Sequence, residues 1–143
     1  MIKPVPIIII DDDPEEHDLM KEVWEQSKIS YPLISFTNGK QLLDYLQSDN
    51  EIPFLIISDI NLSPMDGFEL RKRILEDESS KFKSIPFIFW SGSASESQIK
   101  KAYDLSSHGF FIKPSSFNDL KEFIKDIIAY WRKSEIPFLH GRY

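Results

Sequence analysis

Short apolar runs recur at nearly regular intervals along the chain, each flanked by polar residues or by Pro and Gly. They are VPIIII (5–10), LISF (33–36), PFLIIS (53–58), IPFIFWS (85–91) and GFFIK (109–113). Their length and their β-branched and aromatic content predict strands. The runs at 53–58 and 85–91 are apolar nearly throughout, which is typical of strands covered on both faces of a sheet.

The segments between these runs carry apolar residues at helical spacing. The four clearer stripes are Leu19, Met20, Val23 and Trp24; Leu42, Leu43 and Leu46; Leu70, Ile74 and Leu75; and Leu120, Phe123, Ile124, Ile127, Ile128 and Trp131. The segment SESQIKKAYDLSS (95–107) shows the spacing more weakly. Alternating strands and helices with short connections predict right-handed crossovers and a parallel sheet coated on both sides. This α/β architecture places ligands at the carboxyl ends of the strands.

Composition narrows the classes of function. With 143 residues the chain suits one domain, expected at 1–133 and followed by a tail at 134–143. The net charge of −6, without a basic block, argues against a nucleic-acid partner. The absence of cysteine excludes disulfides and thiolate chemistry. No stretch has the length and apolarity of a membrane span or signal peptide, so a cytoplasmic location without membrane contact is expected.

Three consecutive aspartates follow the first predicted strand. Asp13 is expected to cap the next helix, because Pro14 suits the first helical position. Asp11 and Asp12 have no such task, and each would repel Asp59 at the end of the third strand by about 4 kcal/mol at ~4 Å in an effective dielectric of ~20. A hard cation relieves that repulsion and prefers oxygen ligands. The pattern therefore predicts a site for Mg²⁺ or Mn²⁺.

Two further strand ends contribute a hydroxyl and a cation. Ser91 ends the fourth predicted strand, and Lys113 ends the fifth. In a parallel sheet these groups share one edge with the aspartates. A metal and a lysine can neutralise a phosphoryl group while a carboxylate attacks it, so the edge is suited to phosphoryl transfer.

The motifs IIIIDDDP, IISDINLSPMDGFEL, IPFIFWSGS and GFFIKP stand in an order and spacing that resemble a known family. From about Val5 to Trp131 the chain is similar to the receiver domain of bacterial two-component response regulators. The resemblance implies a flavodoxin-like (βα)₅ fold with strand order 2-1-3-4-5. The chain departs from the family at Ser63, where proline is commoner, and Pro64 follows one position later.

The resemblance also implies a metal site around the phosphorylated residue. Asp59 would be the phosphoacceptor and a metal ligand. Asp12 would bind the metal directly, and Asp11 would act mainly through metal-bound water. Asn61 would contribute its backbone carbonyl.

Three further residues match positions that sense the phosphoryl group. Ser91 would hydrogen-bond the group after the switch, and Lys113 would pair with it. Phe110 matches the switch aromatic. The Lys113–Pro114 peptide bond would be cis, as in the family. By contrast, His17, His108 and His140 are scattered without a metal-ligand spacing and are expected at the surface.

The function that follows is a stand-alone receiver that accepts a phosphoryl group from a sensor histidine kinase or a histidine phosphotransfer protein. It would not be an enzyme beyond its own phosphorylation and dephosphorylation. Output would come through contacts with an unidentified downstream protein, or through a phosphorylation-dependent homodimer. Two alternatives stay open: a receiver-like module that binds without phosphorylation, and a phosphohydrolase that uses the Asp-x-Asp spacing within DDDPEE.

Overall fold

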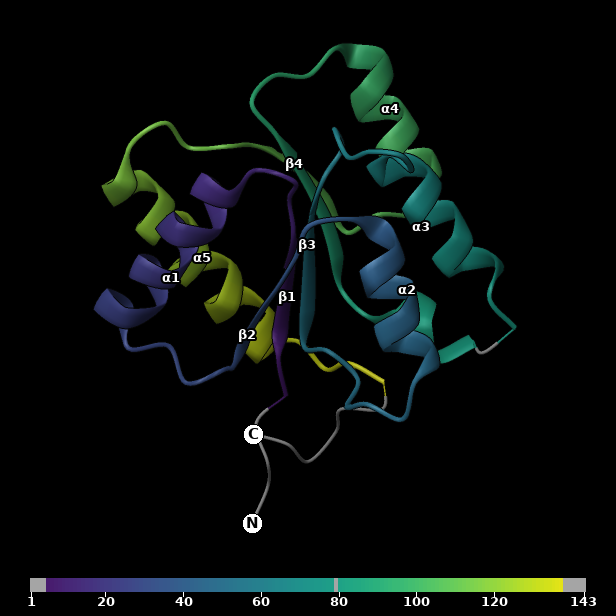
Figure 1. The fold of residues 1–143 in the computed structure, drawn as a ribbon, viewed down its shortest axis with the longest axis horizontal. Coiled ribbons are helices and arrows are strands. Elements are labelled where there is room, and N and C mark those ends of the chain that lie inside the picture. Colours follow the sequence, from purple (N-terminus) through teal and green to yellow (C-terminus); the bar gives the residue numbers. More distant parts are fainter. Residues whose placement is uncertain (1–4, 79, 138–143) are drawn as a thin grey trace.

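The computed structural model describes residues 5–78 and 80–137, which form one five-stranded parallel sheet with helices on both faces (Figure 1). The strand order is β2-β1-β3-β4-β5, so the predicted flavodoxin-like fold is confirmed. In chain order the elements are β1 (Ile7–Ile10), α1 (Pro14–Ser27), β2 (Leu33–Phe36), α2 (Gly39–Gln47), β3 (Leu55–Asp59), α3 (Gly67–Glu76), the 3₁₀-helix η1 (Ser80–Ser84), β4 (Phe87–Ser91), α4 (Glu96–Asp104), β5 (Gly109–Ile112) and α5 (Phe117–Lys133).

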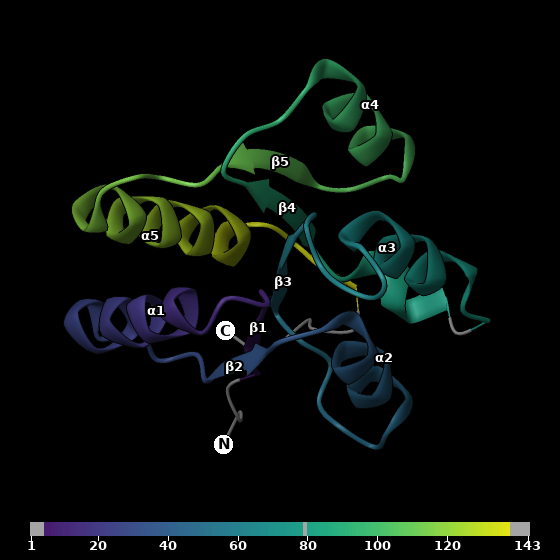
Figure 2. The same ribbon diagram turned by 45° about the horizontal axis from the view of Figure 1, so that its top comes forward.

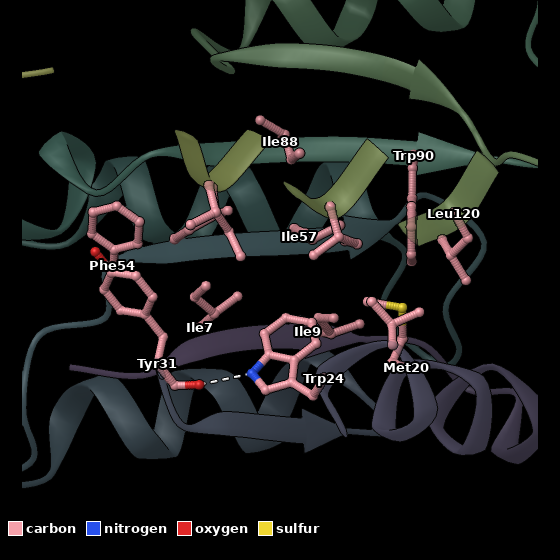
Figure 3. Close-up of a cluster of buried hydrophobic side chains, with 14 of the residues drawn as sticks. Ile7, Ile9, Met20, Trp24, Tyr31, Phe54, Ile57, Ile88, Trp90 and Leu120 are labelled. Carbon is pink, nitrogen blue, oxygen red and sulfur yellow. Dashed lines mark hydrogen bonds between the residues drawn. The ribbon is translucent and has the colours of Figure 1, made fainter. Parts of the chain in front are cut away.

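The sheet separates two apolar clusters, because alternate residues of a strand point to opposite faces. Ile7 and Ile9 of β1 face α1 and α5, whereas Ile8 and Ile10 face the layer of α2, α3 and α4 (Figure 2). In the α1–α5 layer, Trp24 donates a hydrogen bond from Nε1 to the carbonyl oxygen of Tyr31 at 2.7 Å (Figure 3). The central strands β1, β3 and β4 are buried throughout, which confirms the prediction for the nearly apolar runs at 53–58 and 85–91.

Each of the five α-helices is directly preceded by a residue whose side chain accepts a backbone N–H from the first turn. These residues are Asp13, Asn38, Asp66, Ser95 and Ser116. Such caps satisfy amide groups that have no partner within the helix. The prediction that Asp13 is a capping residue is confirmed, since its Oδ1 accepts the Glu15 N–H at 3.0 Å.

Several side chains differ from their expected environment. Leu19 belongs to the predicted apolar stripe of α1 but is 38% exposed. His17 was expected at the surface and is buried instead, because it lies on the inner side of α1 with Nε2 2.7 Å from the Asp11 carbonyl oxygen. His108 is exposed, as predicted, and His140 lies outside the described residues.

The segment after α5 returns to the core. α5 ends at Lys133, and Ile136 in the expected tail is buried among residues of the α1–α5 layer. Residues 138–143 lie outside the described part of the chain. Within the residues that the structure describes, none of the helices combines the length and apolarity needed to cross a bilayer.

His108, which precedes β5 and contacts the first residue of β4, is expected to make the free energy of unfolding depend on pH. His108 is exposed overall, but its Nδ1 accepts the Phe87 N–H at 3.0 Å in a partly buried contact. Partial desolvation of the ring, followed by the charge of Arg71, holds the pKa of His108 below the ordinary 6.5. The unfolded chain therefore takes up a proton first on acidification, so this stabilisation is complete above about pH 6.5 and falls below it.

Urea unfolding at about pH 7.5 and 5.5 measures this effect, against His108→Gln, which keeps an acceptor without titrating. We expect the wild type to lose up to about 1 kcal/mol more than the variant, a small value because His108 is exposed to solvent. Equal losses in the two proteins contradict the prediction.

Candidate functional site

The carboxyl edge of the sheet gathers polar side chains from four strand ends. Asp59 is the last residue of β3 and Ser91 the last of β4, while Asp11 and Lys113 directly follow β1 and β5. Asp11 and Ser91 are 1% exposed and Asp59 is 6% exposed. Carboxylates are rarely buried to this extent without a partner, so the cluster needs a compensating charge.

Lys113 supplies that charge. Its Nζ lies 2.7 Å from Asp11 Oδ2 and 2.9 Å from Asp59 Oδ2, so one ammonium bridges both carboxylates. The same Nζ lies 5.4 Å from the centroid of the Trp90 ring, within the range of a cation–π interaction.

The pKa values of the bridged groups reflect this arrangement. Burial raises the pKa of Asp11, although the hydrogen bond from Lys113 opposes that effect. Burial alone would lower the pKa of Lys113, but its hydrogen bonds to Asp11 and Asp59 outweigh burial and raise it. Lys113 therefore stays charged near neutral pH.

Asp12 does not join this cluster. Its side chain is exposed, and the described residues contain no group of three or more His, Asp or Glu side chains placed to hold a metal. The chain bends at Asp12, after the end of β1, and Asp11 Oδ1 accepts the Asp13 N–H at 3.0 Å across this bend, so buried Asp11 and exposed Asp12 lie in different environments. The structure therefore brings together Asp11 and Asp59 of the predicted ligand set and leaves Asp12 in solvent.

Asn61 connects the acidic residue and the hydroxyl. Its backbone N–H donates to Asp59 Oδ1 at 2.9 Å, and its side-chain Nδ2 donates to Ser91 Oγ at 3.4 Å. Sequence reasoning assigned Asn61 only a backbone carbonyl, because nothing in the pattern indicates where its amide points. It also missed His17, which contacts the carbonyl of Asp11 and so supports the backbone that carries the buried carboxylate.

Phe110 lies in the layer of α2, α3 and α4. Its half-buried ring is 6.4 Å from that of Phe89, which is 5.3 Å from that of Phe68 in α3. The predicted cis bond at Lys113–Pro114 is wrong, because the cis peptide bond of the described residues is Ser63–Pro64. Either isomer is accessible to a bond that precedes proline, so the sequence alone does not choose between them.

Gly67 allows α3 to begin directly against the strand end that carries Asp59. A Cβ at Gly67 would lie 2.4 Å from the Asp59 carbonyl oxygen and 2.9 Å from Ile60 Cα. We expect Gly67→Ala to lower the free energy of unfolding by about 1–3 kcal/mol, because backbone atoms must move. Thermal unfolding measures this against Gly92→Ala, where no atom lies within 4 Å of the added Cβ. Equal stability of the two variants contradicts the prediction.

The fold and this edge define a receiver domain. The sequence profile of the response regulator receiver domain matches residues 7–125, and the chain belongs to this family. The probable methanogenesis regulatory protein FilR2 of Methanothrix harundinacea is 27% identical over 132 residues, which are 90% of this chain and 84% of FilR2.

Two solved structures resemble the whole fold. The phosphorylated cyanobacterial phytochrome response regulator RcpA is 26% identical, with a TM-score of 0.81 over 94% of this chain and 99% of RcpA. The Mn²⁺-bound form of response regulator Rcp1 is 26% identical, with a TM-score of 0.80 over 94% of this chain and 99% of Rcp1. Receiver domains are phosphoacceptor signalling proteins that bind a divalent metal and take phosphoryl groups from histidine kinases or phosphotransfer proteins.

The donor set fits a hard divalent cation. Asp11 and Asp59 present carboxylate oxygens on one edge, and both already bind a cation, the ammonium of Lys113. Oxygen ligands of this kind suit Mg²⁺ or Mn²⁺, which retain water at positions that the protein leaves open.

Proposed function

We propose that the protein accepts a phosphoryl group on Asp59 from a histidine kinase or a histidine phosphotransfer protein, in a reaction that requires Mg²⁺. The observation that carries this proposal is the ammonium of Lys113 shared between the buried carboxylates of Asp11 and Asp59. In this arrangement the carboxylate of Asp59 is the nucleophile, and the ammonium of Lys113 supplies a positive charge beside it. Asp11, Asp12, Asp59 and the Asn61 carbonyl would hold the metal, with Mn²⁺ as a substitute.

In the proposed reaction a carboxylate oxygen of Asp59 attacks the phosphorus of a phosphohistidine. The new O–P bond forms as the N–P bond breaks, and the electron pair returns to the imidazole. Lys113 releases its bond to Asp59 and pairs with a phosphoryl oxygen, while Asn61 N–H keeps the aspartate oriented. A bound divalent metal adds neutralisation of the phosphoryl charge.

The proposed response begins at Ser91. Its hydroxyl exchanges the 3.4 Å contact with Asn61 for a phosphoryl oxygen, and the ring of Phe110 repacks in response. The exposed apolar side chains of Ile99, Tyr103 and Ile112 lie on α4 and β5, where they suit a downstream protein or a second copy as partner. Such a change shifts a two-state equilibrium and involves no catalysis on another substrate. We assign this activity to the cytoplasm, where it would meet its phosphodonor.

Intact-mass measurement with acetyl phosphate, with Mg²⁺ or with EDTA, tests the proposal. We expect a gain of one phosphoryl group that requires the metal. Because rapid hydrolysis can hide an adduct, beryllofluoride binding to the Mg²⁺-loaded protein is measured in parallel. If neither an adduct nor beryllofluoride binding occurs, the proposal is wrong and the chain is a binding module. Continuous release of phosphate from monoesters would instead indicate a phosphohydrolase.

A further inference from the structure

Arg71 of α3 is a buried cation that contacts the end of the neighbouring helix α4. Arg71 is only 1% exposed. Nε donates to the carbonyl oxygen of Leu105 at 3.1 Å, and Nη2 donates to that of Ser106 at 2.7 Å. The guanidinium also lies over the ring of Phe87, 5.1 Å from its centroid. Burial lowers the pKa of Arg71 to about 10, which leaves it charged at neutral pH.

The two carbonyls belong to the C-terminus of α4, where helical carbonyls lack partners within the helix. Leu105 is the residue that caps α4, and Ser106 has a φ of 56°, a left-handed conformation unusual for serine. A cation at this end is favoured by the helix dipole. Arg71 therefore satisfies and fixes the turn through which α4 passes into β5.

The rest of α4 is loosely held. Ala102 is the buried residue of this helix, whereas Ile99 is 37% exposed and Tyr103 is 55% exposed. Near its start α4 is capped by its own residues, Ser95 and Gln98. One end of the helix is thus tied to α3 by two hydrogen bonds, and the other end depends mainly on local contacts.

Packing alone does not account for an arginine at this position. Arg71 makes no ion pair within the described residues, and its Nη1 is buried there without a hydrogen-bond partner. An apolar side chain of similar length would avoid the desolvation of the charge, and such replacements are often neutral or stabilising. Methionine is such an apolar side chain, but unlike arginine it cannot donate hydrogen bonds that hold two carbonyl oxygens in a fixed geometry.

We propose that Arg71 is a positioning residue that fixes the C-terminal end of α4 on α3, so that the response to phosphorylation moves the N-terminal end of α4. This inference rests on the proposed function. This contact of Arg71 with the end of α4, called the anchor below, lies at the amino ends of the strands, because Arg71 covers Phe87, the first residue of β4. Asp59 lies at the carboxyl ends of the strands, together with Ser91, the last residue of β4. The helix then pivots about a fixed end, and its exposed residues change position most near Ser95.

Hydrogen exchange detected by mass spectrometry tests this pivot on the full chain. The amides of Leu105, Ser106 and Ser107 donate within the anchored turn, at 3.1, 2.9 and 3.2 Å. We compare their exchange with that of residues 95–99 in wild type, Arg71→Met and the control Arg73→Met, which removes an exposed arginine two positions away. Each protein is measured free and with Mg²⁺ and beryllofluoride, and its phosphorylation by acetyl phosphate is recorded.

In the wild type we expect beryllofluoride to change the exchange rates at residues 95–99. The exchange rates at 105–107 should stay within about twofold of those in the free protein, since the anchor persists in both states. Arg71→Met should speed exchange at 105–107 about tenfold in the free protein and spread the beryllofluoride response over the whole helix. Its phosphorylation rate should match that of the wild type, and Arg73→Met should resemble the wild type throughout.

The proposal is overturned if Arg71→Met leaves exchange at 105–107 unchanged, or if beryllofluoride alters both ends of α4 equally in the wild type. Should Arg71→Met not fold, Arg71→Lys replaces it, because it keeps the charge but cannot hold both carbonyls in fixed geometry; unchanged exchange then overturns the anchor. If the wild type shows neither phosphorylation nor any beryllofluoride response, the proposed function and the pivot fail, while the exchange of the free Arg71 variants still decides the anchor.

Discussion

Replacing Asp59 by asparagine is expected to abolish phosphorylation by acetyl phosphate, lowering its rate by more than about a hundredfold. The amide has nearly the same shape as the carboxylate but is not a nucleophile. Lys113 keeps its 2.7 Å bond to Asp11, so the bridge survives on one side and the fold persists. Intact-mass spectrometry in the presence of Mg²⁺ measures the result, with circular dichroism to verify folding.

Asp66→Asn is the matched control for this substitution. Asp66 is an exposed aspartate seven positions later that caps α3 by accepting the Glu69 N–H at 2.8 Å, and asparagine caps equally well. We expect it to be phosphorylated at the wild-type rate. A phosphoryl adduct on Asp59→Asn would show that another carboxylate is the acceptor, and peptide mapping after borohydride reduction would identify it.

Replacing Lys113 by methionine is expected to destabilise the metal-free protein by about 3 kcal/mol at neutral pH. The change leaves the buried carboxylates of Asp11 and Asp59 without their shared ammonium, and they then repel each other. Because Mg²⁺ no longer competes with the ammonium, it should bind the variant more tightly than the wild type and restore most of the lost stability. Urea unfolding with and without Mg²⁺ measures both effects.

Lys100→Met serves as the control, because Lys100 forms an exposed pair with Asp104 within α4. Such surface pairs contribute about 0.5 kcal/mol or less, and no dependence on Mg²⁺ is expected. If Lys113→Met is as stable as Lys100→Met without metal, Lys113 does not compensate the buried charge. If Mg²⁺ stabilises wild type and Lys113→Met equally, the ammonium and the metal do not share these carboxylates.

The architecture could be predicted because each of its determinants is local. The apolar runs, the capping residues and the short connections are all properties of a few neighbouring residues, and parallel strands bring their carboxyl ends to one edge. The meeting of Asp11, Asp59, Ser91 and Lys113 follows from that topology and the positions of four residues in the chain. These features suffice to locate the candidate site.

Other features depend on side-chain direction, which a linear pattern does not contain. Whether Asp12 turns toward Asp59 or into solvent is decided by the backbone after β1, and the amide of Asn61 reaches Ser91 because the paired strands β3 and β4 end side by side. Arg71 has the appearance of a surface residue in the sequence, yet a carbonyl pair 34 and 35 positions away draws it into the interior. His17 is buried for a similar reason, through its contact with a backbone carbonyl.

The sheet divides the core into two layers, and this division determines which structural changes intrinsic tryptophan fluorescence can report. All three tryptophans, Trp24, Trp90 and Trp131, belong to or pack against the α1–α5 layer, whereas Phe110 and α4 lie in the other layer. Trp90 also sits beside the ammonium of Lys113. Intrinsic fluorescence of this protein is therefore a detector of chemistry at the carboxylates and is nearly blind to movement of α4. An unchanged spectrum says nothing against a rearranged output face.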